Sequence, residues 1–94
     1  MKFKRERDFL QLLCRDYILE LLDKVGWSEV QNNIIKLRYL EHKSITRVRM
    51  DLYLTSATYV RYFDNAMQKL QTYLDCHQDD KFYKYYWKIF DIKE

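Results

Sequence analysis

Basic side chains crowd into the middle of this chain of 94 residues, where their chemistry suits the binding of phosphate groups. Residues 36–61 hold six lysines and arginines against two acidic residues, a local charge of +4 in a protein whose formal net charge is +3. The six are Lys36, Arg38, Lys43, Arg47, Arg49 and Arg61. A basic stretch inside a nearly neutral remainder is the pattern expected when one face of a protein meets a phosphate backbone.

Residues suited to catalysis or metal binding are sparse. His42 and His77 have no nucleophile or paired carboxylate at a useful spacing, and the chain has no glycine-rich phosphate loop. Cys14 and Cys76 are too few for a disulfide framework and lack zinc-ligand spacing, so we expect both to be buried apolar residues in a reducing cytoplasm. Although Cys76 and His77 are adjacent, two ligands do not make a tetrahedral site. We therefore expect no enzymatic activity, no metal and no cofactor.

The composition indicates an all-α fold. One glycine and no proline leave few turns other than the junctions between helices. Hydrophobic residues make up 48% of the chain and aromatic residues 17%, which supplies large side chains to a small core. A chain of this length has room for one domain, residues 1–94, and we expect four to five helices.

The chain shows no sign of a membrane segment. No apolar run approaches the roughly 20 residues that cross a bilayer. The basic N-terminus followed by FLQLLC has the outline of a signal peptide, but acidic residues interrupt the basic part and Arg15-Asp16 end the apolar run. We expect a protein that works in the cytoplasm without membrane contact.

Residues 1–26 are expected to contain one helix, from about residue 7 to residue 25. Its apolar stripe consists of Phe9, Leu10, Leu13, Tyr17, Leu21 and Val25, and four further apolar residues widen it. So broad an apolar face needs two neighbouring helices, or one neighbour and a partner chain. Gly26 stands where a helix end favours a residue with positive φ, so we expect it to stop this helix.

Residues 28–76 carry the caps of three further helices. Ser28 and Gln31 have capping-box spacing, which predicts a second helix that runs to about Glu41 and breaks at His42 and Lys43.

Two more caps follow this break. Ser44 is placed to cap a short third helix through about Leu52, with Ile45, Val48 and Leu52 inward, and Thr55 is placed to cap a fourth. The apolar face of that fourth helix consists of Tyr59, Tyr62, Phe63, Ala66, Met67, Leu70 and Leu74. The opposite face is small, polar and basic, which suits either a major-groove reader or an ordinary solvated surface.

An aromatic segment, residues 79–94, closes the chain. The run KFYKYYWKIFDI favours a short helix that buries Phe82 and Tyr86 and is capped by Asp79 or Asp80, although its composition leaves a strand open. This segment suits a cover over a small core, an interface, or a stacking surface for single-stranded nucleic acid.

The run from Leu37 to Leu70, LRYLEHKSITRVRMDLYLTSATYVRYFDNAMQKL, resembles the fourth region of bacterial sigma factors. Within that group, TSATYVRYFDNAM is most similar to the sigma-like activators of phage late genes, of the ArpU and RinA types. The resemblance implies a helix-turn-helix in a DNA-binding transcriptional regulator that is encoded by a phage or mobile element and acts in the cytoplasm of a bacterial host.

The resemblance also implies which residues contact double-stranded DNA. The base-reading residues are Ser56, Ala57, Val60, Arg61 and Asn65, with Asp64 as an alternative at the far edge. Arg61 is the best candidate for a guanine contact, and Ala57 or Val60 for a thymine methyl. The residues expected to hold phosphates are Lys43, Ser44, Thr46, Arg47 and Arg49.

Two positions depart from the family's pattern. Tyr53 stands where the turn usually has glycine, and Arg49 stands where a small residue lets the two motif helices approach. Arg49 either points inward or contacts phosphate. The departures keep open a second function, that of a non-enzymatic module which binds RNA polymerase or another transcription regulator. A homodimer through the N-terminal helix or the aromatic segment is a further open arrangement.

Overall fold

The computed structural model describes residues 3–90, and most of this range is helical. Six α-helices and one π-helical segment, η1, follow one another, with no strand among the described residues. The prediction of an all-α fold is confirmed, but six helices replace the predicted four to five. Residues 1–2 and 91–94, which belong to the predicted N-terminal and aromatic segments, lie outside the described part.

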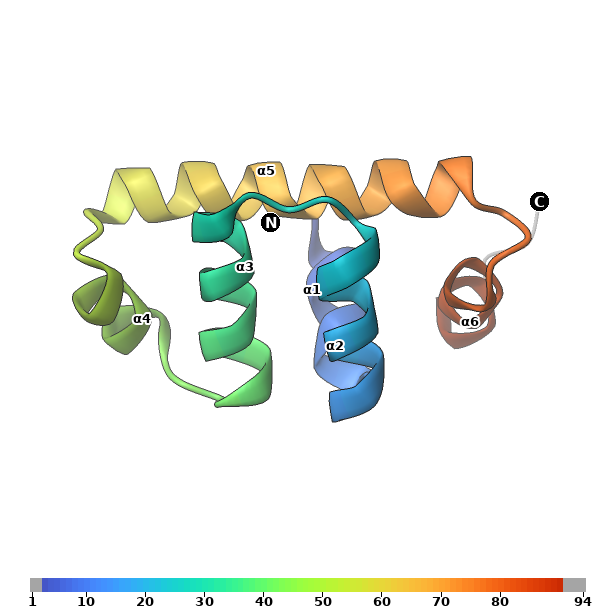
Figure 1. Ribbon diagram of the computed structural model, residues 1–94, viewed down its shortest axis with the longest axis horizontal. Coiled ribbons are helices and arrows are strands. Elements are labelled where there is room, and N and C mark those ends of the chain that lie inside the picture. The colour runs from blue at the N-terminus through green and yellow to red at the C-terminus, as the bar shows by residue number, and fades with distance from the viewer. Residues whose placement is uncertain (1–2, 91–94) are drawn as a thin grey trace.

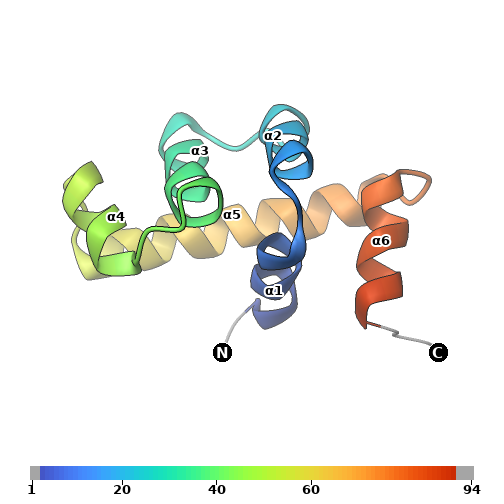
Figure 2. The same cartoon turned by 90° about the horizontal axis from the view of Figure 1, so that it is seen from below.

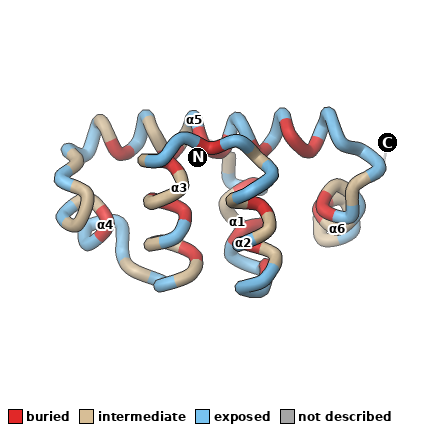
Figure 3. Tube along the Cα trace, in the orientation of Figure 1, coloured by how far each residue is buried: buried red, intermediate tan, exposed pale blue. Residues whose placement is uncertain are grey.

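The helix α5, Ser56–Cys76, is the longest of the described helices, and α1, α3 and α6 pack against it. Figure 1 shows it along the whole upper side with the other helices beneath it, and Figure 2 gives the view from below. Buried positions recur along α5 (Figure 3). They are Tyr59, Phe63, Ala66, Met67, Leu70, Tyr73 and Leu74. Because 21 residues at 1.5 Å each span roughly 32 Å, α5 accounts for most of the 40 Å length of the fold.

The N-terminal part folds as two helices, α1 (Lys4–Leu12) and α2 (Arg15–Lys24). The prediction of a single helix over residues 7–25 is wrong, because Leu13 and Cys14 have extended backbones with ψ of 146° and 167°. The break turns the two halves toward different neighbours: α1 packs on α5 and α6, and α2 packs on η1. Part of the broad apolar face is thus covered within the chain, while Leu12 and Leu19 remain 58% and 38% exposed.

Gly26 ends the segment after α2, as predicted, with a φ of 83°. The next residue, Trp27, is buried, and its Nε1 donates a hydrogen bond of 2.8 Å to the carbonyl oxygen of Ala66 on α5. The positive φ of Gly26 therefore turns the chain so that the indole of Trp27 can bond to α5.

The helix α3, Glu29–Ile35, begins at the predicted capping box and continues into η1, Lys36–Leu40. The Oγ atom of Ser28 accepts from the N–H of Gln31 at 3.3 Å, and the Oε1 atom of Gln31 accepts from the N–H of Ser28 at 2.9 Å. Both contacts of the box are present, so the predicted start of the second helix is confirmed.

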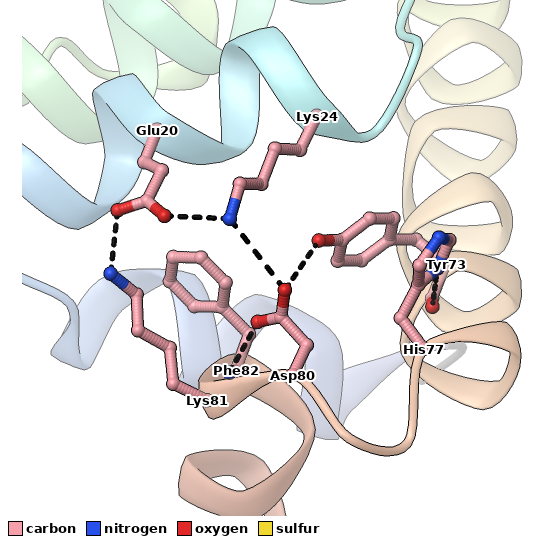
Figure 4. A network of polar contacts seen from close by, with 7 residues as sticks. All are labelled: Glu20, Lys24, Tyr73, His77, Asp80, Lys81 and Phe82. Atoms are coloured by element: carbon pink, nitrogen blue, oxygen red, sulfur yellow. Dashed lines mark hydrogen bonds and ion pairs between the residues drawn. The ribbon is translucent and has the colours of Figure 1, made fainter.

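The helix α6, Lys81–Phe90, confirms the preference for a helix in the aromatic segment. Asp80 caps it by accepting from the N–H of Phe82 at 2.8 Å, and the hydroxyl of Tyr73 donates to the other oxygen at 3.0 Å (Figure 4). Burial alone would raise the pKa of Asp80, but these hydrogen bonds and the ammonium of Lys24 outweigh it and lower the pKa. Asp80 thus joins α6 to α5.

A second part of this polar network joins α6 to α2. Glu20 pairs with Lys24 at 2.7 Å and with Lys81 at 2.8 Å, and both contacts lower its pKa (Figure 4). The two lysines are exposed and Glu20 is half-buried, so these ion pairs contribute little to stability and mainly orient the helices.

Aromatic packing holds α6 against the N-terminal helices. The ring centroids of Phe9 and Tyr86 lie 5.3 Å apart, as do those of Tyr17 and Phe82. The hydroxyl of Tyr86 donates to Oε2 of the buried Glu6 at 3.0 Å. Of the three uses considered for the aromatic segment, this packing is that of a cover over the core. Between residues 3 and 90, no helix combines the length and apolarity needed to span a membrane.

Candidate nucleic-acid interface

The helix α4, Ile45–Leu52, leads into α5 through a three-residue turn, residues 53–55. Both predicted caps are present. The Oγ atom of Ser44 accepts from the N–H of Arg47 at 3.1 Å, and the Oγ1 atom of Thr55 accepts from the N–H of Thr58 at 3.2 Å. Each cap satisfies one of the amides that a helix start leaves without a partner. The starts of these two helices are therefore as predicted.

The turn after α4 is of the Schellman type and is centred on Tyr53. The N–H of Tyr53 donates to the carbonyl of Met50 at 3.3 Å, and the N–H of Leu54 donates to the carbonyl of Arg49 at 2.9 Å. Tyr53 has φ 57° and ψ 44°, the left-handed conformation that glycine adopts at little cost. Tyr53, at the position where the family's pattern has glycine, therefore adopts a backbone conformation typical of glycine. The residue is 94% exposed.

The predicted base-reading residues form one exposed row on the first half of α5. Ser56, Ala57, Val60, Arg61 and Asn65 are all exposed. Steps of four residues link Ser56 to Val60 and link Ala57 through Arg61 to Asn65, which places them on neighbouring lines of one helix face. The alternative Asp64 is half-buried. We call these five residues the α5 row.

Two of the predicted phosphate contacts already pair with one carboxylate. Lys43 Nζ lies 2.9 Å from Asp51 Oδ2 and 3.5 Å from Glu41 Oε1, and Arg47 Nε lies 3.2 Å from Asp51 Oδ1. The hydrogen bond that Lys43 donates to Asp51 lowers the pKa of Asp51 and raises the pKa of Lys43. Lys43, Arg47 and Asp51 carry a net charge of +1, and Glu41 beside Lys43 brings the sum to zero, so the local field is weaker than the count of basic residues implied.

The other three predicted phosphate contacts differ in how exposed they are and in whether they already have a hydrogen-bond partner. Ser44 is exposed but its hydroxyl serves as the cap of α4, and Thr46 is exposed. Arg49 is half-buried, and its Nε is buried without a hydrogen-bond partner among residues 3–90. The stem of Arg49 thus takes the inward course that was one of two alternatives.

An apolar surface surrounds the turn. Val48 is fully buried and Leu52 half-buried, but the prediction that Ile45 points inward is wrong, because it is 46% exposed. Met50 is 63% exposed and lies beside Tyr53. A groove of about 410 Å³ is lined by Thr46, Arg49, Met50, Tyr53 and Leu54. We call it the turn groove.

Two contacts that position the residues of the candidate interface were not predicted from the sequence. The Nη1 atom of Arg38 donates to the carbonyl oxygen of Lys43 at 2.7 Å and so fixes the loop before α4. Asp51 gathers Lys43 and Arg47. The four-residue step from Arg47 to Asp51 was a visible signal for the second contact, whereas nothing in the spacing indicated the first.

The cysteines do not form a site. Cys14 and Cys76 are exposed free thiols, so the expectation that both are buried is wrong. Within the described part of the chain, no group of three or more His, Cys, Asp or Glu side chains is placed to hold a metal ion.

The α5 row, the cations around Asp51 and the turn groove are the features from which a function can be inferred. Comparison of the chain with models of protein families, with curated proteins and with solved structures gives no match.

Proposed function

We propose that the protein is a DNA-binding transcriptional regulator, encoded by a phage or mobile element, that reads promoter DNA with the first half of α5. The observation that carries this proposal is the exposed α5 row, which begins directly after the turn from α4. Small and polar side chains there let a helix approach the base edges of a major groove. The sigma-like resemblance of residues 37–70 points the same way.

Within the α5 row, the chemistry of each residue suggests its role. The guanidinium of Arg61 can donate two hydrogen bonds to O6 and N7 of a guanine. Ala57 and Val60 offer methyl groups to thymine, and Ser56 and Asn65 offer hydrogen bonds to either groove edge or backbone. Each good base contact contributes about 1–3 kcal/mol of discrimination.

The start of α4 supplies the proposed phosphate contacts. Lys43 and Arg47 provide cations, while the hydroxyl of Thr46 and the free amides of the first turn provide neutral donors. On binding, Lys43 and Arg47 exchange part of their contact with Asp51 for phosphate oxygens. These contacts set the position of α5 on the duplex without reading its sequence.

Selection from a pool of random duplexes tests this function. The full chain should enrich a defined sequence, and Arg61→Ala should lose preference at one or two base pairs. Lys84→Ala, which removes one exposed charge from α6, is the matched control and should keep the full preference. Absence of any enriched sequence with the unaltered protein would contradict the proposal.

A second candidate is a non-enzymatic module that binds RNA polymerase or another transcription regulator. The turn groove favours it, because Met50 and Tyr53 are among the most exposed large apolar side chains of the described residues. Capture of RNA polymerase that is lost in Tyr53→Ala, together with no duplex binding, would decide for this candidate.

A further inference from the structure

A small polar pocket lies apart from the α5 row, between α1 and the end of η1. Its volume is about 120 Å³ and its walls are Gln11, Arg38, Tyr39 and His42. Each of these side chains offers a hydrogen-bond donor, namely an amide, a guanidinium, a phenol hydroxyl and an imidazole N–H. None of them is acidic. Convergent donors around one cationic group are the chemistry that holds an oxyanion.

Arg38 has donor capacity to spare. Its Nη1 binds the carbonyl of Lys43 at 2.7 Å, and its guanidinium carbon lies 5.7 Å from the centroid of the Tyr39 ring. Its Nε is buried and makes no hydrogen bond among residues 3–90, and its guanidinium also lies near the Tyr59 phenol, where it opposes the rise that burial causes in the pKa of Tyr59. None of the ion pairs in that range involves Arg38. A half-buried guanidinium that has no carboxylate partner keeps its charge available for an anion.

A second arginine adds to the positive potential behind the pocket. Arg7 on α1 also has a buried Nε without an acceptor in the described range. Burial raises the pKa of Tyr39 to about 12, and the charges of Arg38 and Arg7 oppose that rise. The carboxylate of Asp8, which also raises the pKa of Tyr39, already pairs with the ammonium group of Lys4 at 2.9 Å. The cationic charge here therefore exceeds the anionic charge.

The backbone around the pocket is unusual. Arg38 and Tyr39 belong to η1, in which the N–H of Glu41 donates to the carbonyl of Lys36 across a wide π turn. His42 follows with a φ of 56°. Such turns are rare and frequently occur at functional sites, and a left-handed residue other than glycine stores strain. This geometry brings Arg38, Tyr39 and His42 to one pocket.

We propose that this pocket binds a single phosphate-type oxyanion, with Arg38 as the main cation and Gln11 and His42 as further donors. A space of about 120 Å³ suits one such group and is too small for a whole nucleotide. Since Arg38 also holds the carbonyl of Lys43, an anion on its guanidinium would stiffen the loop that starts α4. The pocket stands independently of the proposed DNA reading by α5.

Titration of the full chain with inorganic phosphate, followed by amide NMR at constant ionic strength with chloride as reference, tests the proposal. Saturable shifts should appear around Gln11 and residues 38–43. Gln11→Ala changes an exposed residue and should weaken phosphate binding about threefold to tenfold through loss of one donor. Arg38→Lys should weaken it more, and Lys84→Ala should leave it unchanged. Shifts that follow ionic strength alone, or an unchanged affinity in Gln11→Ala, would overturn the proposal.

A duplex arm identifies the source of the oxyanion. If the ligand is a phosphodiester of bound DNA, a duplex should perturb the same amides and inorganic phosphate should compete with it. If the ligand is free phosphate, its shifts should persist unchanged in the presence of duplex. A protein that bound no DNA at all would still give a readable phosphate titration, so the two proposals fail separately.

Discussion

The ammonium group of Lys43 lies 2.9 Å from a carboxylate oxygen of Asp51, across the break that separates η1 from α4. The other oxygen of Asp51 lies 3.2 Å from Nε of Arg47. One carboxylate thus holds two of the cations proposed to meet phosphates. Because that carboxylate would repel a DNA backbone, Asp51 should moderate the affinity of the protein for any duplex.

Asp51→Asn should therefore strengthen duplex binding. Removal of one negative charge near the phosphates should raise affinity about threefold at low salt. If one more cation then neutralises a phosphate, the slope of log affinity against log salt should steepen by about 0.9. Fluorescence anisotropy with a labelled duplex measures both quantities. Asp75→Asn, an equal charge change at the exposed far end of α5, is the control, and equal gains in the two variants would refute a local role for Asp51.

Asp80→Ala should destabilise the fold by about 1 kcal/mol at pH 7, because it removes the cap of α6. The pKa of Asp80 is lowered in the folded protein, whereas an unfolded aspartate titrates near about 3.9. The contribution is therefore complete above about pH 4 and is lost as the pH falls through the folded pKa. Urea unfolding should show that the difference in unfolding free energy between the variant and the unaltered protein shrinks as the pH falls from 7 to 2. Asp79→Ala, its exposed neighbour, should show neither effect.

Tyr86→Phe should cost about 1–3 kcal/mol, since it leaves the buried carboxyl group of Glu6 without its donor. Burial raises the pKa of Tyr86 to about 12, above the unfolded value of about 10. Its contribution is complete below pH 10 and is lost as the pH rises through 12. Unfolding measured between pH 9 and pH 12 should show that the unfolding free energies of the variant and of the unaltered protein become equal as the pH rises. Tyr83→Phe on the same helix should not reproduce this pH dependence.

Helix starts and stops were predictable because they depend on neighbouring residues. The caps at Ser28, Ser44 and Thr55 each follow from a side chain and an amide within three residues, and the stop at Gly26 follows from the positive φ that glycine tolerates. The break at Leu13 escaped prediction, because nothing local stops a helix there. On either side of this break the helices have different neighbours, α5 and α6 for α1 and η1 for α2.

The candidate interface was predictable to a similar degree. Helical periodicity put the small, polar and basic face of this helix opposite its buried face, and the sigma-like resemblance selected the residues of the α5 row on it. The link from Arg38 to Lys43 depends on a π turn and on the left-handed His42, which no spacing rule indicates. The pairing of Lys43 with Asp51 likewise depends on how the chain turns between two helices.

Tyr53→Gly should stabilise the protein by about 1 kcal/mol, because glycine relieves the left-handed backbone at that residue. Tyr53→Ala should give no comparable gain, since alanine keeps the strain. Urea unfolding of both variants measures the difference. If Tyr53→Gly is no more stable than Tyr53→Ala, the ring or its neighbours offset the strain. Duplex affinity should stay unchanged in both, whereas loss of a protein partner in both would favour the turn groove as the functional surface.

The salt dependence of duplex binding decides whether this protein reads DNA through α4 and α5. Neutralisation of two phosphates by Lys43 and Arg47 predicts that log affinity falls linearly with log salt, with a slope of about −2 or steeper. Arg47→Ala should reduce that slope by about 0.9 for every sequence, while Arg61→Ala should also remove base preference. A duplex affinity that stays constant between about 50 and 200 mM salt, or no binding at the lower value, would contradict the proposed function.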